Sequence, residues 1–252
     1  MQWNAQSIMH NKNVFKKVLS DKQIHIALIP ETWLKPSMKL IINGYTIVRN
    51  DCGNAHNGVA IIVHNSIHFQ NVITSYDDSI QNIDIQIQIN HKLISIVSFY
   101  SPPRSTPSFT KSKLNNLIKS IPGPMIIAGD FNAHNTLWSC GSTDTCGRDI
   151  LDVMEENDLA LLNDGSPTTV GSNSWWPNGL DLTMVSSSLL LSCEWKVCDS
   201  PLGGYHLPTV TEYTFDYISH LPKSSQIIPT HFNPKLVDWP MYKENINQLE
   251  NL

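Results

Sequence analysis

The chain has 252 residues, of which 41% are hydrophobic and 15% are charged, and its formal net charge is −5. These values predict a folded core, exclude a wholly disordered chain, and argue against binding to nucleic acid through bulk charge alone. No apolar run reaches the ~18 residues of a membrane span, the first residues lack a secretory signal, and the five cysteines form no C-x-x-C pair. We therefore expect an intracellular domain without membrane attachment, disulfide scaffold or zinc knuckle.

The first half of the chain contains patterns typical of one helix and several strands. Residues 13–21 place apolar side chains on one helical face, and residues 24–29 form a short apolar run of strand length. Residues 59–63 are apolar and lie between turn residues, which predicts a second strand. Residues 83–89 alternate strictly between isoleucine and polar residues, which predicts a half-buried antiparallel strand that pairs with residues 93–100 as a hairpin.

The second half continues the alternation of helices and strands, which favours an α/β fold. The predicted elements are helices at residues 114–120 and 148–157, and strands at 125–128, 180–185 and 207–213. After about residue 217 the periodic pattern gives way to polar sequence interrupted by prolines. We therefore expect one domain at residues 1–216, followed by a linker at residues 217–252.

Charged residues are distributed unevenly along the chain. Residues 1–50 contain seven Lys and Arg against two acids, and residues 85–129 contain five against none. Residues 144–164 reverse this balance, with seven acids against one Arg. An ordinary solvated surface can produce such a layout, and so can an enzyme in which basic segments flank an acidic centre that acts on a polyanion. The charge pattern alone leaves both interpretations open.

Several polar side chains stand at the ends of predicted strands, where open sheets place their ligand-binding groups. They are Asn4, Glu31, Tyr100, Asp130, Asn132, Asp181 and His206. Each has an ordinary structural explanation, such as an Asx turn at Asp130, a surface acid at Glu31 or a core aromatic at Tyr100. Taken together, they could converge on one edge of a sheet.

The residue types in this set suit phosphodiester cleavage. A carboxylate can hold a divalent cation that neutralises charge developing on the phosphate, and a second group can orient the attacking water. Asn and Tyr can donate hydrogen bonds to phosphate oxygens, and an Asp–His pair fixes the tautomer of its histidine.

The ordered set of short motifs resembles the endonuclease domain of non-LTR (LINE-type) retrotransposons, within the endonuclease/exonuclease/phosphatase superfamily. Each motif is weak alone, but all occur in the family's order across about residues 1–215, and residues 129–168 most resemble the jockey-like branch. The matching stretches are Gln2–Ser7, Pro30–Leu34, Gly58–Ile61, Tyr100–Pro103, Gly129–His134 with Leu137–Trp138, Leu162–Thr168, Leu180–Thr183 and His206–Pro208.

The resemblance implies a four-layer α/β sandwich of two packed mixed β-sheets, like that of DNase I. It implies Mg²⁺-dependent nicking, or alternatively Mn²⁺-dependent nicking, of double-stranded DNA for target-primed reverse transcription. By motif, Glu31 is the expected metal ligand, while Asn4, Tyr100 and Asn132 are expected to contact the scissile phosphate. Asp130 is expected to position the attacking water, and Asp181 to orient His206.

Two departures from the family pattern predict weakened or lost activity. Tyr205 stands where the family has an acid before the histidine, and a neutral phenol supplies no negative charge near pH 7. The apolar half of the first strand is also expected to precede Gln2, and its loss would loosen Asn4. The alternatives are therefore a decayed retrotransposon fragment that at most binds DNA, or a phosphatase or phosphodiesterase of the same superfamily.

The resemblance also implies partners and a location. A reverse transcriptase domain is expected in the full-length element, beyond the stretch around Val237–Trp239. A monomer acting on DNA in the nucleus is expected, and target preference is expected to depend on surface loops such as residues 101–108 and 171–179. Trp175 and Trp176 in the second loop could stack on DNA or pack against the sheet.

Overall fold

The structure is a computed structural model, and it describes residues 1–52, 56–76, 79–103, 110–171 and 176–214. The expected linker at residues 217–252, the stretch 104–108 and Trp175 lie outside the described residues. The α-helices are α1 (Lys12–Asp21), α2 (Lys111–Ser120) and α3 (Thr145–Glu156). The strands are β1 (Ile26–Pro30), β2 (Tyr45–Asn50), β3 (Val59–His64), β4 (Phe69–Tyr76), β5 (Gln81–Ile89), β6 (Lys92–Tyr100), β7 (Met125–Asp130), β8 (Leu159–Leu161), β9 (Asp181–Ser186), β10 (Cys193–Val197) and β11 (Thr209–Tyr213).

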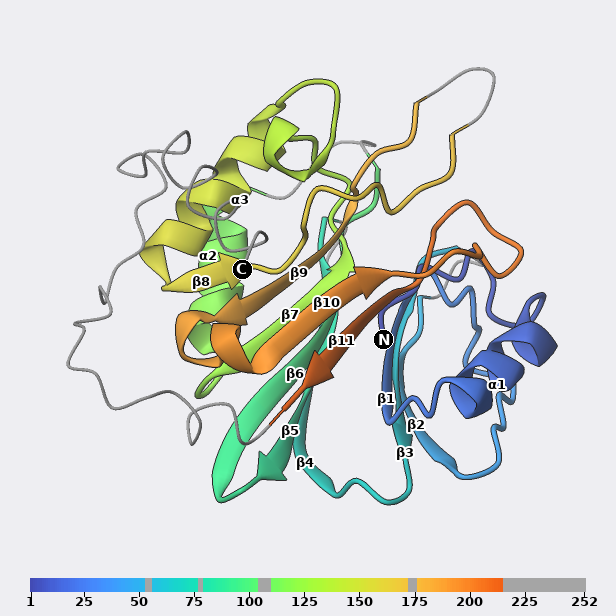
Figure 1. The fold of residues 1–252 in the computed structure, drawn as a ribbon. Helices are drawn as coiled ribbons and strands as arrows, with labels where there is room; N and C mark the ends of the chain where they lie inside the picture. The colour runs from blue at the N-terminus through green and yellow to red at the C-terminus, as the bar shows by residue number, and fades with distance from the viewer. Residues whose placement is uncertain (53–55, 77–78, 104–109, 172–175, 215–252) are drawn as a thin grey trace, which may run out of the picture. The chain divides into compact units, whose positions relative to one another are not determined.

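The first sheet is assembled around the beginning of the chain. β1, β3 and β2 pair antiparallel in the order β1-β3-β2, and β10 pairs antiparallel with β11 (Figure 1). Gln2 joins these two groups, because it bridges Leu28 of β1 in parallel and Thr209 of β11 antiparallel. The backbone of residues 1–5 therefore lies between β1 and β11 and makes this a mixed sheet.

The second sheet has the strand order β4-β5-β6-β7-β9-β8. The predicted hairpin is present, with β5 and β6 paired antiparallel from Gln81 opposite Tyr100 to Ile89 opposite Lys92. β6 and β7 are parallel neighbours, since α2 provides the crossover between them, and the remaining pairs are antiparallel. This sheet is therefore mixed as well.

Three apolar clusters show how the layers pack. One joins side chains of β1 and β3 to side chains of β5, β6, β7 and β9, so the two sheets face each other. A second packs Phe15 and Leu19 of α1 against the first sheet, and a third packs α2 and α3 against the second sheet (Figure 1). The layers are helix, sheet, sheet, helices, and the predicted four-layer sandwich is confirmed.

The burial of β5 differs from the prediction. Its isoleucines face the other sheet, but Asp84 and Gln86 on the opposite face are buried too. Asn71 donates a hydrogen bond to Gln86 and Asn82 donates one to Asp84 Oδ1, whereas Asp84 Oδ2 is buried without a hydrogen-bond partner among the described residues. Burial raises the pKa of Asp84 to about 6. An alternating sequence thus identified the strand correctly, but it wrongly predicted that the polar face would be solvated.

Among the described helices, none combines the length and the apolar character needed to cross a membrane.

Candidate active site

The ends of several strands meet at one edge of the sandwich. Tyr100 ends β6 opposite Asp130, the last residue of the parallel strand β7, and Asp130 is in turn opposite Asp181, the first residue of β9. β1 of the first sheet ends at Pro30, directly before Glu31. This register brings three of the predicted acids to the same edge, although they are up to 150 residues apart in sequence.

Asn4 connects the two sheets at this edge. Its Nδ2 donates to Glu31 Oε1 at 2.8 Å and to Asp130 Oδ2 at 2.8 Å, and its Oδ1 accepts from the backbone N–H of Gln6 at 3.2 Å. The residue is 0% exposed. Asn4 is thus held by partners from both sheets, and the backbone on either side of it donates to Leu28 and Pro30.

Glu31 is presented by a tight turn in which it adopts a positive φ of 49° and Trp33 one of 53°. The indole N–H of Trp33 donates to Glu31 Oε2 at 3.0 Å, so each carboxylate oxygen of Glu31 has a different donor. Positive φ is uncommon for residues with a side chain, and it persists where surrounding contacts enforce it. The turn fixes the direction in which this carboxylate faces the site.

Asp181 and His206 form a buried pair. His206 Nδ1 lies 2.7 Å from Asp181 Oδ2, and the same oxygen accepts from Thr168 Oγ1 at 2.8 Å. The other oxygen, Oδ1, accepts from Gln2 Nε2 at 2.7 Å. The second ring nitrogen of His206 lies 3.9 Å from Asp130 Oδ2, so the imidazole stands between two carboxylates. An Asp that accepts from Nδ1 leaves Nε2 to face the reacting groups.

The electrostatics follow from burial and these close contacts. Burial opposes a charge on His206, but the carboxylates of Asp181, Asp130 and Glu31 outweigh it and raise the pKa of His206 to about 9. Burial also raises the pKa of Asp130, although the neighbouring His206 counteracts this. For Tyr100, burial and then the charges of Glu31 and Asp130 raise the pKa of the hydroxyl above its usual value, so it remains a hydrogen-bond donor at neutral pH.

Asn132 and Gly129 flank Asp130. Asn132 adopts a positive φ of 45°, its backbone N–H donates to Asp130 Oδ1 at 3.0 Å, and its Nδ2 donates to the carbonyl of Ser101 at 2.9 Å. A Cβ on Gly129 would lie 1.8 Å from the carbonyl oxygen of Phe99 in β6. Any side chain there would push β7 away from β6, so glycine before Asp130 is required by the close packing of the strands.

The donor set suits a divalent metal ion with hard oxygen ligands. Glu31 and Asp130 direct carboxylate oxygens toward one shared amide, and among the described ion pairs the carboxylates of Asp130 and Asp181 have no cationic partner except His206. Buried carboxylates without compensating cations are costly, and Mg²⁺ prefers carboxylate oxygens. One oxygen or nitrogen from each of Asp130, Asp181 and His206 also lies within 4.8 Å of the others. Because Asp181 and His206 already bind each other, Glu31 with Asp130 is the better-suited pair.

Known proteins resemble this chain in sequence. Residues 94–210 match the family model described as endonuclease-reverse transcriptase. The chain is 22% identical over 227 residues to the RNA-directed DNA polymerase from mobile element jockey of Drosophila melanogaster, covering 87% of this chain and 22% of that protein. It is 24% identical over 239 residues to the probable RNA-directed DNA polymerase from transposon X-element of the same organism, covering 92% of this chain and 25% of that protein. The chain thus spans about a quarter of these relatives.

Solved structures share the fold. The endonuclease domain of TRAS1, a telomere-specific non-LTR retrotransposon, aligns with a TM-score of 0.67 at 22% identity, covering 84% of this chain and 96% of that one. The resemblance to non-LTR retrotransposon endonuclease domains is confirmed. An AP endonuclease from Archaeoglobus fulgidus aligns with a TM-score of 0.69 at 16% identity, covering 84% of this chain and 97% of that one. The endonuclease/exonuclease/phosphatase fold predicted from the motifs is therefore present.

All seven predicted residues lie at one edge of the sandwich, while their individual roles stay predictions. Three further residues that sequence reasoning did not single out hold them in place, namely Gln2 and Thr168 at Asp181 and Trp33 at Glu31. All three fall inside the stretches that carry the family resemblance, which was the signal available for finding them. A neutral amide or hydroxyl that supports a charged partner has no signature of its own in a single sequence.

Tyr205, which stands where the resemblance predicts an acid, directly precedes His206. Its backbone N–H donates to Gln6 Oε1 at 3.2 Å, and its carbonyl accepts from the backbone N–H of Val170 at 2.9 Å. Its side chain is 53% exposed, whereas His206 directly after it is buried. The backbone of this motif is thus anchored on both sides, and the substitution changes the side chain at an exposed position.

The elevated pKa of His206 predicts a dependence of stability on pH. Because the folded pKa of about 9 exceeds the unfolded value of about 6.5, the contribution of His206 is complete below about pH 6.5 and is lost as pH rises through about 9. Between about pH 7.5 and about pH 9.5, the loss amounts to about 2 kcal/mol of the free energy of unfolding. Urea unfolding in EDTA should show this fall in the parent protein, and His206→Gln should show a fall that is smaller by that amount. Equal falls in both proteins would contradict the charged pair.

Proposed function

We propose that this domain nicks double-stranded DNA in a Mg²⁺-dependent reaction, or alternatively a Mn²⁺-dependent one. The main support is Asn4, whose single amide nitrogen joins Glu31 to Asp130, next to the buried Asp181–His206 pair. This arrangement combines a carboxylate pair suited to a hard cation with a histidine held in one tautomer. In the full-length element, the nick would supply the 3′-hydroxyl that a reverse transcriptase domain extends, and the domain would act in the nucleus as a monomer.

Each side chain would have a separate role in hydrolysis. Water attacks the phosphorus atom, and the bond from phosphorus to O3′ breaks. The proton that water loses is transferred in the end to the leaving O3′, which becomes a hydroxyl. Asp130 orients the water and accepts its proton, for which a pKa raised by burial is well suited. His206 stabilises the negative charge on the phosphate, and Asp181 holds the ring in place.

The remaining donors bind the phosphate before the reaction. Tyr100, which stays protonated at neutral pH, can donate its hydroxyl to a phosphate oxygen, and Asn132 can donate the amide hydrogen that it does not give to Ser101. Asn4 donates both amide hydrogens to Glu31 and Asp130, so it would contact the phosphate by exchanging one of these hydrogen bonds. A divalent ion at Glu31 would neutralise charge that accumulates on the phosphate during the reaction. Trp176 is 87% exposed, which favours contact with DNA over packing against the sheet.

Removal of the metal is the direct test. Supercoiled plasmid incubated with the protein and Mg²⁺ should become nicked circles, EDTA should stop the reaction, and excess Mg²⁺ should restore it. The nick should carry a 3′-hydroxyl, which a DNA polymerase can extend without prior treatment. Release of phosphate from a small phosphorylated substrate without any nicking would instead favour a phosphatase or phosphodiesterase of the same superfamily.

Tyr205 favours a second candidate, a decayed retrotransposon endonuclease that binds DNA without cutting it. The family's acid at this position would add a negative charge next to His206, and the phenol does not. A folded protein that shifts plasmid DNA in a gel but leaves it intact with both Mg²⁺ and Mn²⁺ would support this candidate.

A further inference from the structure

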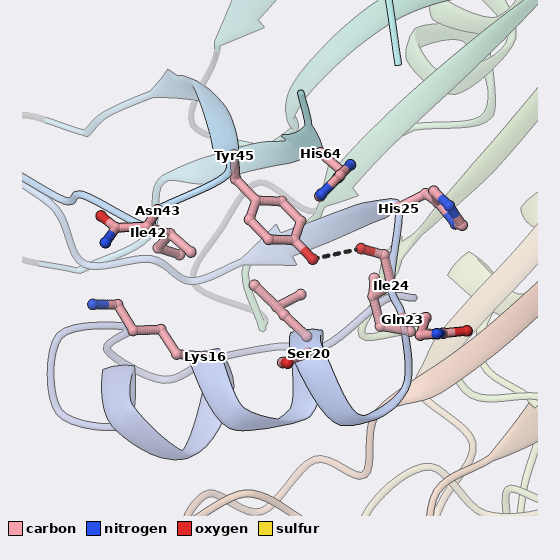
Figure 2. A pocket seen from close by; sticks show the side chains of 10 residues that line it. Lys16, Ser20, Gln23, Ile24, His25, Ile42, Asn43, Tyr45 and His64 are labelled. Atoms are coloured by element: carbon pink, nitrogen blue, oxygen red, sulfur yellow. Dashed lines mark hydrogen bonds between the residues drawn. The ribbon is translucent and has the colours of Figure 1, made fainter. Parts of the chain in front are cut away.

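A pocket of about 670 Å³ lies at the end of the first sheet opposite the candidate active site. It is formed where β1 begins, β2 begins and β3 ends, and α1 covers one side (Figure 2). His25 in the pocket and Glu31 in the site are six positions apart in the sequence, which corresponds to about 20 Å along an extended strand. Its volume is within the range of about 300–1,000 Å³ that is typical of small-ligand sites. Its lining includes Lys16, Gln23, His25, Asn43, Tyr45 and His64.

The lining is suited to an anion. It includes Lys16 and two histidines together with neutral donors, and it includes no carboxylate. Figure 2 shows Lys16 and Asn43 at one edge of the pocket and His25 and Gln23 at the other. In the part of the chain that the structure describes, none of the α1 lysines forms an ion pair, and the only acid on this helix is Asp21 at its end. The positive charge here is therefore not neutralised by neighbouring carboxylates.

Two aromatic rings lie side by side in the lining of the pocket. The ring of Tyr45 meets that of His64 edge to face at 5.1 Å, and the Tyr45 hydroxyl donates to the carbonyl of Ile24 at 2.8 Å, which fixes the ring (Figure 2). His64 Nδ1 lies 2.7 Å from the hydroxyl of Ser66, so Nε2 is the ring nitrogen that remains for a ligand. Aromatic faces beside cationic side chains are the combination with which proteins hold unpaired nucleotides.

We propose that this pocket binds one nucleotide of a single-stranded nucleic acid, with the phosphate at Lys16 and the base against the rings of Tyr45 and His64. A duplex does not suit the pocket, because its bases are already stacked and paired and cannot enter a cavity lined by rings. Because of its distance from Glu31, the pocket would be a second binding site, separate from the site at which DNA would be cut. The proposal does not depend on catalysis, so it stands or fails separately from the proposed nicking activity.

Binding of a fluorescein-labelled oligothymidylate in EDTA, followed by fluorescence anisotropy, tests the proposal. Lys16→Glu should raise the Kd about tenfold and reduce the salt dependence by about one released counterion. His64→Gln, which removes the ring, should weaken binding about fivefold to tenfold, in line with the loss of base stacking. Lys119→Glu on α2 is the matched charge control and should change the Kd less than about twofold.

Competition experiments identify the source of the nucleotide. Displacement of the probe by thymidine monophosphate would indicate a site for one nucleotide, and displacement only by oligothymidylate or oligouridylate would indicate a strand of DNA or RNA. Either result supports the proposal if Lys16→Glu weakens the binding of that competitor. Equal weakening by Lys16→Glu and Lys119→Glu, or tighter binding of duplex DNA with the same sensitivity to Lys16→Glu, would overturn it. Unchanged melting temperatures would establish that the variants remain folded.

Discussion

Replacing Glu31 with alanine is expected to lower Mg²⁺-dependent nicking of plasmid DNA by on the order of 10³-fold. Glu31 is the carboxylate that the turn after β1 directs toward Asn4 and Asp130, and each of its oxygens is held by a separate donor. Without it, Asp130 alone would face the metal ion, and the ion would lose a charged ligand. Initial rates measured over a series of Mg²⁺ concentrations should show a lower affinity for Mg²⁺ as well as a lower maximal rate.

Matched variants separate the loss of the ligand from a general disturbance of the turn. Glu31→Gln keeps the size of the side chain and removes the charge, so it should be nearly as inactive as Glu31→Ala. Trp33→Phe keeps an aromatic ring and removes the hydrogen bond to Glu31 Oε2, so it should cost about tenfold or less. If Glu31→Ala nicked as fast as the parent, the metal ion would have to be held elsewhere, and the Asp130, Asp181 and His206 group would be the next candidate.

The fold could be predicted from the sequence where local patterns and tertiary environment agree. β7 is an apolar run that ends in Gly-Asp, and its environment, buried on both faces between two neighbouring strands, is the one such a run favours. β2 and β4 were not predicted, because their sequences are rich in polar residues and β4 contains a register shift between Gln70 and Ile73. Such strands are stabilised by pairing with a neighbour more than by their own hydrophobic pattern.

The candidate site shows the same division between local and non-local information. The acids and the histidine have distinctive chemistry, so their positions at the ends of predicted strands were enough to identify them. The convergence of Asn4 on Glu31 and Asp130 depends on the packing of two sheets, and Asp181 meets Gln2 from 179 residues away. Contacts of this kind are set by tertiary structure, so the sequence indicated which residues to compare but not which atoms bind each other.

Restoring the family's acid with Tyr205→Asp is expected to raise the nicking rate by on the order of 10²-fold. Tyr205 directly precedes His206, and its backbone is joined through Gln6 to Asn4, so the main chain at this position is held beside the site residues. The tyrosine side chain is about half exposed, so its replacement leaves no large cavity and should not destabilise the fold. The gain should therefore come from the added negative charge near His206 and the metal ion.

Tyr205→Asn is the control that isolates this charge, because asparagine matches the size of aspartate and stays neutral. It should nick no faster than the parent protein. An added carboxylate also repels DNA, so Tyr205→Asp should increase kcat while KM for DNA rises at low salt. If Tyr205→Asn gained as much as Tyr205→Asp, removal of the bulky phenol would be the cause. If neither gained and both remained folded, the tyrosine would not limit the rate, and the weakened activity predicted from this substitution would be wrong.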